Sequence, residues 1–365
     1  MNLLRRLPLS RLLLLCALVV AIGVSATAIA FALGSGPTPP PQSLAQAIHD
    51  ALGGGQLEGA SANITLTDNL LEGASLADGG HSGELTSSPL VTGGSGRLWV
   101  AKDGRVRLEL QSQQGDTEIL YDGHTISIYD AATNTEYRYT PPAEEGSSSS
   151  SAPAAGQHEV PSVARIEEAI AHLGKHADVS GATATDVGGQ PAYTVRVSPK
   201  ESGSLFGGVE LSFDANHGVP LRAAIYSTTT STPVVELAAT EISYGPVASS
   251  VFEVNPPADA KVEEITFPSG GTQPEHRPNT TEKPNLTTQG HGPSTIAILE
   301  SKTKAGTKSP SEALEGLPKV TINGTSASEL RTELGTLLTF ERSGVRYLLA
   351  GSVTPAAIEA VARGL

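Results

Sequence analysis

The sequence predicts a mainly β protein of the α+β class, in which a long, curved antiparallel sheet has helices over its concave face. Many segments alternate apolar and polar residues with period two, and Asp-Gly pairs stand between some of these segments. Ahead of a Pro-rich stretch, only two segments have the apolar spacing of amphipathic helices. Two helices cannot cover both faces of so long a sheet, so we expect a curved sheet whose concave face they close.

The N-terminus carries an uncharged apolar run, 12–33, that follows three arginines. As a helix this run would span about 33 Å, close to the thickness of a bilayer core. That length favours a retained membrane anchor over a cleavable signal peptide, whose apolar core is shorter. Small residues spaced two apart between Ala28 and Ala32 leave cleavage open. In both cases the chain that follows is predicted to be exported.

Composition restricts the class of partner. Acidic residues outnumber basic ones by 38 to 24, which gives a net charge of −14 and argues against nucleic acid as a partner. The single cysteine, Cys16, lies inside the apolar run, so the exported part has no disulfide. Leu15 precedes it where a lipidated cysteine would follow a small residue, so we interpret Cys16 as a membrane-buried side chain.

The chain after the apolar run begins with a Pro/Gly spacer, 34–42. Ser43, with a glutamine three residues later, has the capping-box pattern of a helix start, and Gly53 is expected to end that helix. A strand is predicted over 62–67, and a Gly/Ser-rich loop from there to Gly96.

Strict alternation then predicts strands with one wet face. Apolar residues alternate with arginine and glutamate over 106–110, and again at Ile126 and Ile128. The Asp-Gly pairs at 103–104 and 122–123 predict tight hairpin turns in which both central residues adopt positive φ.

The second half of this region repeats the pattern of helix and strands. Residues 141–158 form a low-complexity insert with five consecutive serines, and a helix is predicted to begin at Pro161 and end at Gly174. The four alternating strands predicted after this helix span 192–198, 208–214, 219–227 and 234–243. In the last of them the alternation of apolar residues shifts by one position at Ile242, which predicts a β-bulge.

A Pro/Thr/Gly/Asn-rich stretch, 269–293, is predicted to be a disordered linker, and 294–365 a small C-terminal α+β domain. In that domain we expect strands at "TIAILE" and "VRYLLAGS". The final helix should have Thr354 as its cap and Pro355 at its first position.

No pattern of catalytic or metal-binding residues is present. The sequence has no phosphate-binding loop and no nucleophile elbow. His172 and His176 lack the glutamate of a zinc-protease helix. His124 and Asp130 stand at opposite ends of one predicted strand, roughly 20 Å apart, which is too far for a catalytic dyad. We therefore expect a protein that is not an enzyme and that needs neither metal nor cofactor.

Three stretches, in order, resemble the LolA-type lipoprotein-carrier superfamily, in an exported form of the actinobacterial type. They are "LYDGHTISIYDAATNTEYRY", "QPAYTVRVSPKESGSLFGGVELSFDANHGVPLRAAIYS" and "EISYGPVASSVFEVNPPADAKV", and the likeness covers 43–268. It implies an unclosed half-barrel with helices as a lid, which binds acyl chains or lipid-modified proteins and is not an enzyme. The groove residues that it implies are Val106, Leu108, Leu110, Ile126, Ile128, Val195, Val197, Leu211, Phe213, Leu221 and Ile225, with Ile166 and Ile170 on the lid.

Two features depart from the simple carriers. The arginine that ties down their lid is missing from the first strand, and Arg97 is only a loose candidate for it. The C-terminal domain has a faint likeness to that of RseB/MucB-type relatives, which sense envelope lipids or lipoproteins and restrain an anti-sigma factor.

Three hypotheses follow for this exported cell-envelope protein, whether tethered by 12–33 or secreted after cleavage. The first is a carrier or sensor whose partner is a lipid or a lipidated protein. The second is a regulator that acts on a membrane anti-sigma factor or another envelope signalling protein through 294–365. The third is a structural envelope protein whose apolar strand faces pack a solid core.

Overall fold

The computed structural model describes residues 36–55, 57–71, 88–113, 115–141, 160–253, 256–265, 285–302 and 317–365. The apolar run 12–33 lies outside these ranges, as does nearly all of the insert expected at 141–158. Within the described ranges, no helix is both long enough and apolar enough to cross a membrane.

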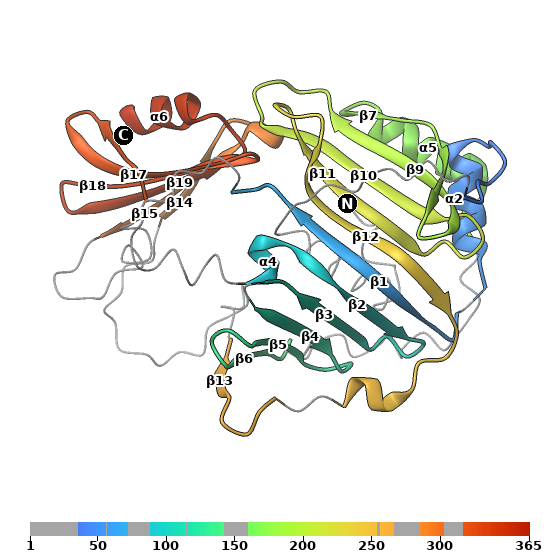
Figure 1. Ribbon diagram of the computed structural model, residues 1–365. Coiled ribbons are helices and arrows are strands. Elements are labelled where there is room, and N and C mark those ends of the chain that lie inside the picture. Colours follow the sequence, from blue (N-terminus) through green and yellow to red (C-terminus); the bar gives the residue numbers. More distant parts are fainter. Residues whose placement is uncertain are drawn as a thin grey trace, which may run out of the picture.

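One large sheet dominates the chain (Figure 1), and the predicted fold class is confirmed. Its order is β13-β6-β5-β4-β3-β2-β1-β12-β11-β10-β9-β7, and β8 also pairs with β9. The sheet is antiparallel apart from the β13–β6 pair, and its outermost strands are not joined to each other. The strands are β1 (Gly59–Asp68), β2 (Gly94–Ala101), β3 (Val106–Gln111), β4 (Asp116–Tyr121), β5 (Ile126–Asp130), β6 (Thr135–Tyr139), β7 (Ala177–Val179), β8 (Thr183–Val187), β9 (Gln190–Pro199), β10 (Phe206–Asp214), β11 (Pro220–Ser227), β12 (Pro233–Tyr244) and β13 (Lys261–Glu264).

The sheet bends sharply where β12, β1, β2 and β3 meet. The predicted bulge is confirmed, because the β1–β12 register shifts between Asn63 and Ile64, opposite Thr240. In β2, Gly96 allows an unusually close approach, since a Cβ there would lie 1.7 Å from the carbonyl oxygen of Glu109. The bulge and this glycine together let the sheet curve instead of lying flat.

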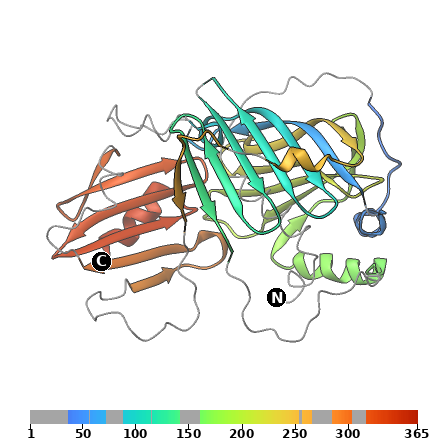
Figure 2. The same ribbon diagram turned by 90° about the horizontal axis from the view of Figure 1, so that it is seen from below.

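Two helices lie side by side on one side of the sheet (Figure 2). As predicted, α2 (Leu44–Gly53) is capped by the Ser43 hydroxyl, which accepts a hydrogen bond from Gln46 N. Helix α5 (Val163–Leu173) ends before Gly174, as predicted, but its cap is Ser162, so it begins two residues after Pro161. Helix α5 packs against α2 and β7, at the end of the sheet formed by β7, β9 and β10.

The connections differ from the predictions in two places. The predicted Gly/Ser-rich loop to Gly96 contains a short helix, α4 (Pro89–Thr92), and β2 already begins at Gly94. The two Asp-Gly turns are also wider than predicted. Gly104 and Gly123 have positive φ, whereas the aspartate before each of them does not. The Asp122 carboxylate instead accepts hydrogen bonds from the backbone N–H groups of His124 and Thr125, so it closes the turn with its side chain.

A second sheet forms the C-terminal part, in the order β14-β15-β19-β18-β17-β16. The predicted linker 269–293 is wrong at its end, because β14 lies within it and pairs with β15. Helix α6 (Pro355–Arg363) covers one face and follows Thr354, as predicted. The strands are β14 (Asn285–Gln289), β15 (Ile296–Lys302), β16 (Lys319–Ile322), β17 (Thr325–Thr332), β18 (Gly335–Arg342) and β19 (Val345–Gly351).

The two sheets touch through loops at the ends of their strands. Leu205 N donates to Ser352 O over 2.8 Å, and the Ser204 hydroxyl donates to the same carbonyl. The Thr229 hydroxyl donates to the Glu333 carboxylate over 2.9 Å. The C-terminal sheet is therefore docked on the β9–β10 and β11–β12 hairpins.

Candidate functional site

The register of the large sheet puts its apolar side chains on one face, which we call the apolar face. In one row across the sheet, Val195, Leu211, Ala223, Leu237 and Leu66 stand opposite one another on successive strands. A second row runs through Leu98, Leu108, Ile119, Ile128 and Tyr137 on β2 to β6. All of the groove residues predicted on strands share this face, because neighbours opposite each other in a ladder point to the same side.

The apolar face is unevenly covered. Its buried centre forms one core cluster that includes Ile64, Leu66 and Leu237. Toward both ends of the sheet the cover is incomplete, and Val209 on β10 is 39% exposed. Of the predicted groove residues, Val106, Leu108, Leu110, Phe213 and Leu221 are buried, whereas Ile126, Ile128, Val195, Val197, Leu211 and Ile225 are half-buried.

Helix α2 makes the direct contact with this face. Ala47 is 1% exposed and packs against Tyr193 of β9 and Phe213 of β10. The predicted lid residues lie on α5, where Ile166 is buried and Ile170 is half-buried. The sequence predicted that both helices close this face, but it placed lid residues only on α5 and missed Ala47. Ala47 is a small residue among the larger apolar residues of α2, and a small side chain there could have indicated that the helix packs closely on the sheet.

Three tyrosines missed as site residues lie at the β6 end of the same face. Tyr121 pairs with Ile126, Ile126 with Tyr139, and Ile128 with Tyr137. All five side chains are half-buried, so this end presents aromatic and branched apolar surface. The alternation that located Ile126 and Ile128 also carries these tyrosines, and each could offer a phenol group to the polar end of a ligand.

A polar cluster lies at the β10–β11 turn. The Asp214 carboxylate is fully buried and accepts hydrogen bonds from the Tyr244 hydroxyl, over 2.6 Å, and from His217 N. The His217 ring lies against the Tyr244 ring, tilted by 37°, with 4.1 Å between ring centroids. Burial, together with the neighbouring Asp214 carboxylate, raises the pKa of Tyr244 above its usual range, so the phenol stays protonated. This cluster fixes the β10–β11 turn against the end of β12.

The charges on the apolar face are few and acidic. Along strands β1–β6 and β9–β12, as the structure describes them, the face carries Asp68 and Asp130 and no lysine or arginine. Arg97, the candidate for a lid-binding arginine, pairs with Glu109 and Asn63 on the opposite, polar face. It therefore does not lie on the apolar face.

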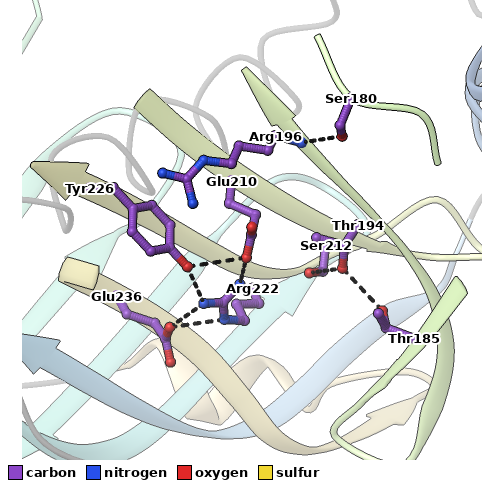
Figure 3. Close-up of polar contacts among 9 residues, drawn as sticks. All are labelled: Ser180, Thr185, Thr194, Arg196, Glu210, Ser212, Arg222, Tyr226 and Glu236. Atoms are coloured by element: carbon purple, nitrogen blue, oxygen red, sulfur yellow. Dashed lines mark hydrogen bonds and ion pairs between the residues drawn. The ribbon is translucent and has the colours of Figure 1, made fainter. Parts of the chain in front are cut away.

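The polar face of β9–β12 has its own buried network (Figure 3). Arg222 forms ion pairs with Glu210 and Glu236 and donates to the Tyr226 hydroxyl over 3.2 Å. Arg196 lies over the Tyr226 ring, 3.9 Å from its centroid. Next to it, the hydroxyls of Thr185, Thr194 and Ser212 are linked by hydrogen bonds. The network ties four strands together on the side opposite the apolar face.

Two hollows also open on the polar face. One, of about 430 Å³, lies over the bend and is lined by Asn63, Arg97, Glu109 and Thr240 among others. The other, of about 130 Å³, lies between β4–β6 and Pro256–Pro257, and Glu118 lines it. Burial raises the pKa of Glu118, which is 3.2 Å from the Arg107 guanidinium. The three acids that line these hollows are all paired, Glu109 and Glu118 with Arg107 and Glu136 with Arg138.

The polar residues tested for catalysis do not converge. His124 follows the Asp122 turn and is exposed, whereas Asp130 ends the strand that begins after that turn. His172 lies in the last turn of α5 and His176 beyond its end, and both are exposed. Among the described residues, no group of three or more His, Cys, Asp or Glu side chains could hold a metal ion.

Comparisons with known proteins give distant structural likenesses. No protein-family model and no curated protein matches the sequence. In structure the chain is similar to MucB and to LolA-superfamily proteins. The MucA/MucB complex of Pseudomonas aeruginosa gives 14% identity over 87% of this chain and 96% of that one, with a TM-score of 0.43. A LolA-superfamily protein of Nitrosomonas europaea gives 9% identity over 85% and 91%, with a TM-score of 0.19. The actinobacterial type stays a prediction.

Proposed function

We propose that this is a non-enzymatic cell-envelope protein that binds the acyl chains of a lipid or a lipoprotein on the apolar face of its large sheet. The observation that carries this proposal is the incomplete cover at both ends of that face. Val209 is 39% exposed, and Ile126 and Ile128 are half-buried, although all three stand on the face that forms the core. A solid core, which is the structural alternative, would bury them.

The free energy available from such a site is large. Each methylene removed from water contributes about 0.8 kcal/mol, so even a partly covered alkyl chain would gain several kcal/mol before its ordering cost. The face offers few groups that would oppose this transfer, because its strands carry apolar and aromatic residues along most of their length. Helix α2 covers only part of the β9–β10 end, where Ala47 packs on Tyr193 and Phe213.

The direct test is to purify the chain from residue 36 onward, extract it with organic solvent and analyse the extract by mass spectrometry. Uptake of a neutral fluorescent probe, N-phenyl-1-naphthylamine, gives a second measure of apolar binding. We expect a co-purifying lipid and a saturable rise in fluorescence. Finding neither would refute the carrier hypothesis and leave the structural alternative.

Neighbouring positions on β5 supply a matched pair of variants. Ile128 faces the apolar side, whereas Ser127 faces the polar side one residue away. Ile128→Lys would place a charge among apolar groups and should weaken probe binding tenfold or more. Ser127→Lys places the same charge on the same strand and should leave binding unchanged. Equal effects of both variants would show that the probe does not bind on this face.

A second function, the binding of an envelope signalling protein, is favoured by the free face of the C-terminal sheet. Opposite α6, leucines form two neighbouring rows of the register, one across β14, β15 and β19 and the other across β18 and β17, and Leu286 is 65% exposed. We propose a membrane-protein partner, such as an anti-sigma factor, for this face. The leucines are Leu286, Leu299, Leu330, Leu337 and Leu348.

The two functions can be separated by where a substitution acts. Leu299→Glu on the free face should abolish co-purification of the partner from membranes but leave probe uptake intact. Thr287→Glu, on the opposite side of β14, is the control. If Leu299→Glu leaves co-purification unchanged, the C-terminal face is not the partner site. In both proposals 12–33 serves as anchor or cleaved signal, 43–268 binds lipid, and the C-terminal sheet is a separate domain.

A further inference from the structure

Asp68 stands at the end of a row of apolar side chains that crosses five strands of the large sheet. Val197 pairs with Val209, Val209 with Ile225, and Ile225 with Val235. Val235 in turn pairs with Asp68, the last residue of β1. Four spacings of about 4.8 Å make this row about 19 Å long. It includes Val209, which is 39% exposed, passes through Val235, which is buried, and ends at a carboxylate.

The Asp68 carboxylate has an unused acceptor. Its Oδ1 accepts a hydrogen bond from Leu70 N, whereas Oδ2 is buried and has no hydrogen-bond partner among the described residues. Among the residues that the structure describes, Asp68 forms no ion pair, and strands β1–β6 and β9–β12 present neither lysine nor arginine on this face. A buried carboxylate oxygen with no donor is unusual, since nearly all such groups find a partner in the protein or in something bound to it. The partner that the ionised carboxylate lacks here is a donor.

We infer that Asp68 receives the polar end of the ligand, and that the site therefore selects amphiphiles whose head group donates a hydrogen bond. A protonated amine and an alcohol share this chemistry. A carboxylate or phosphate head group lacks a donor at neutral pH and would bring a second negative charge beside Asp68, with no cation to separate the two. This inference rests on the proposed function, because the alkyl chain must lie along the apolar row to bring its head group to Asp68.

The position of Asp68 also matches a head group held at an edge. The chain turns away directly after it, and Asn69 N donates to Val234 O, so the carboxylate stands where the strand ladder stops. Burial raises the pKa of Asp68 to about 7, so the carboxylate is fully ionised only above neutral pH. Competition is therefore best measured at pH 8, where Asp68 acts as an acceptor alone.

The test uses the full chain and displacement of N-phenyl-1-naphthylamine by three amphiphiles of equal chain length. They are dodecylamine, monolauroylglycerol and laurate, each used below its micellar concentration. We expect the amine and the glyceride to displace the probe at concentrations about tenfold or more below that of laurate, as a hydrogen bond to a buried charged group allows. If laurate competes equally well or better, the inference is wrong. If the probe itself does not bind, the proposed function fails as well.

Variants then locate the effect. Asp68→Asn keeps an acceptor but removes the charge, so the amine should lose about tenfold in apparent affinity while the glyceride changes little. Asp68→Leu removes the acceptor and should weaken both, while probe binding persists. Asp130→Asn removes the other acid of the same face and should change none of the three. If Asp130→Asn abolishes the preference for the amine, the head group binds at Asp130 and the assignment to Asp68 is wrong.

Discussion

Arg222 offers the sharpest test of how the polar face holds the large sheet together. Its side chain is 19% exposed, and it pairs with Glu236, whose side chain is 7% exposed, and with Glu210, at 19%. Replacing Arg222 by methionine leaves Glu236 buried without its cation. Breaking a buried pair in this way costs about 3–5 kcal/mol, and we expect the free energy of unfolding of the large sheet to fall by that amount.

The double variant makes the reasoning stricter. Removing both charges, in Arg222→Met with Glu236→Met, leaves no isolated carboxylate at that position, and methionine can pack on the buried alanines of the same face. The double variant should therefore be more stable than Arg222→Met alone, by about 2 kcal/mol or more. If the double variant is less stable than Arg222→Met, the loss of stability in Arg222→Met does not come from the unpaired Glu236 carboxylate.

The assay can be confined to the large sheet. The only tryptophan of the chain is Trp99, which lies in β2. Urea unfolding followed by its fluorescence reports on this sheet and not on the C-terminal one. Lys102→Met is the control, because its ion pair with Glu58 is more than half exposed on both sides. Such a pair contributes less than about 1 kcal/mol, so a larger loss in the control would show that the assay does not separate buried from exposed pairs.

Three further predictions concern stability. Gly96→Ala should lower the free energy of unfolding by about 3 kcal/mol or more, because its Cβ would lie 1.7 Å from a carbonyl oxygen of β3, whereas Gly181→Ala meets nothing within 4 Å and should be neutral. Burial raises the pKa of Asp68 to about 7, so the folded state keeps its proton where the unfolded state loses it, and the free energy of unfolding should fall as pH rises from about 4 to 7. Asp68→Asn should remove about 1–2 kcal/mol of this fall, measured by urea unfolding across that pH range. Arg331→Met should destabilise the C-terminal sheet by about 3 kcal/mol in calorimetry, because Glu329, fully buried, loses its cation; an unchanged transition would contradict this.

Local alternation was enough to predict which side chains share a face. The side-chain period of a strand is set within the strand, so the residues from 106 to 110 and Ile126 and Ile128 could be assigned to one side before any pairing was known. The bulge near Ile242 followed from the same rule. The degree of burial could not be predicted in this way. Phe213 is buried and Leu211 only half-buried on one face of one strand, because Ala47 of a distant helix packs on the first.

Contacts between distant segments could not be predicted from the sequence either, because they depend on how the whole chain folds. Arg222 finds one glutamate 12 residues earlier and the other 14 residues later, and no local spacing marks the three as a group. Strand β14 lies in a stretch rich in Pro, Thr and Asn, and only its pairing with β15 makes it a strand. The position of Asp68 at the end of the apolar row could not be predicted either, because its neighbours in that row come from four other strands.

In a usual half-buried sheet the apolar face is covered and the polar face is exposed, whereas in this sheet part of the apolar face is exposed and part of the polar face is buried. On the polar face, Ala224 and Ala238 are 1% and 3% exposed beneath the long side chains around Arg222, so this face covers itself. On the apolar face, Val209 is 39% exposed although transfer of such a side chain from water is favourable by about 2 kcal/mol. A sheet that only needed a stable core would bury its valines before its alanines. The uncovered apolar surface is therefore where this protein has the most free energy to gain from a ligand.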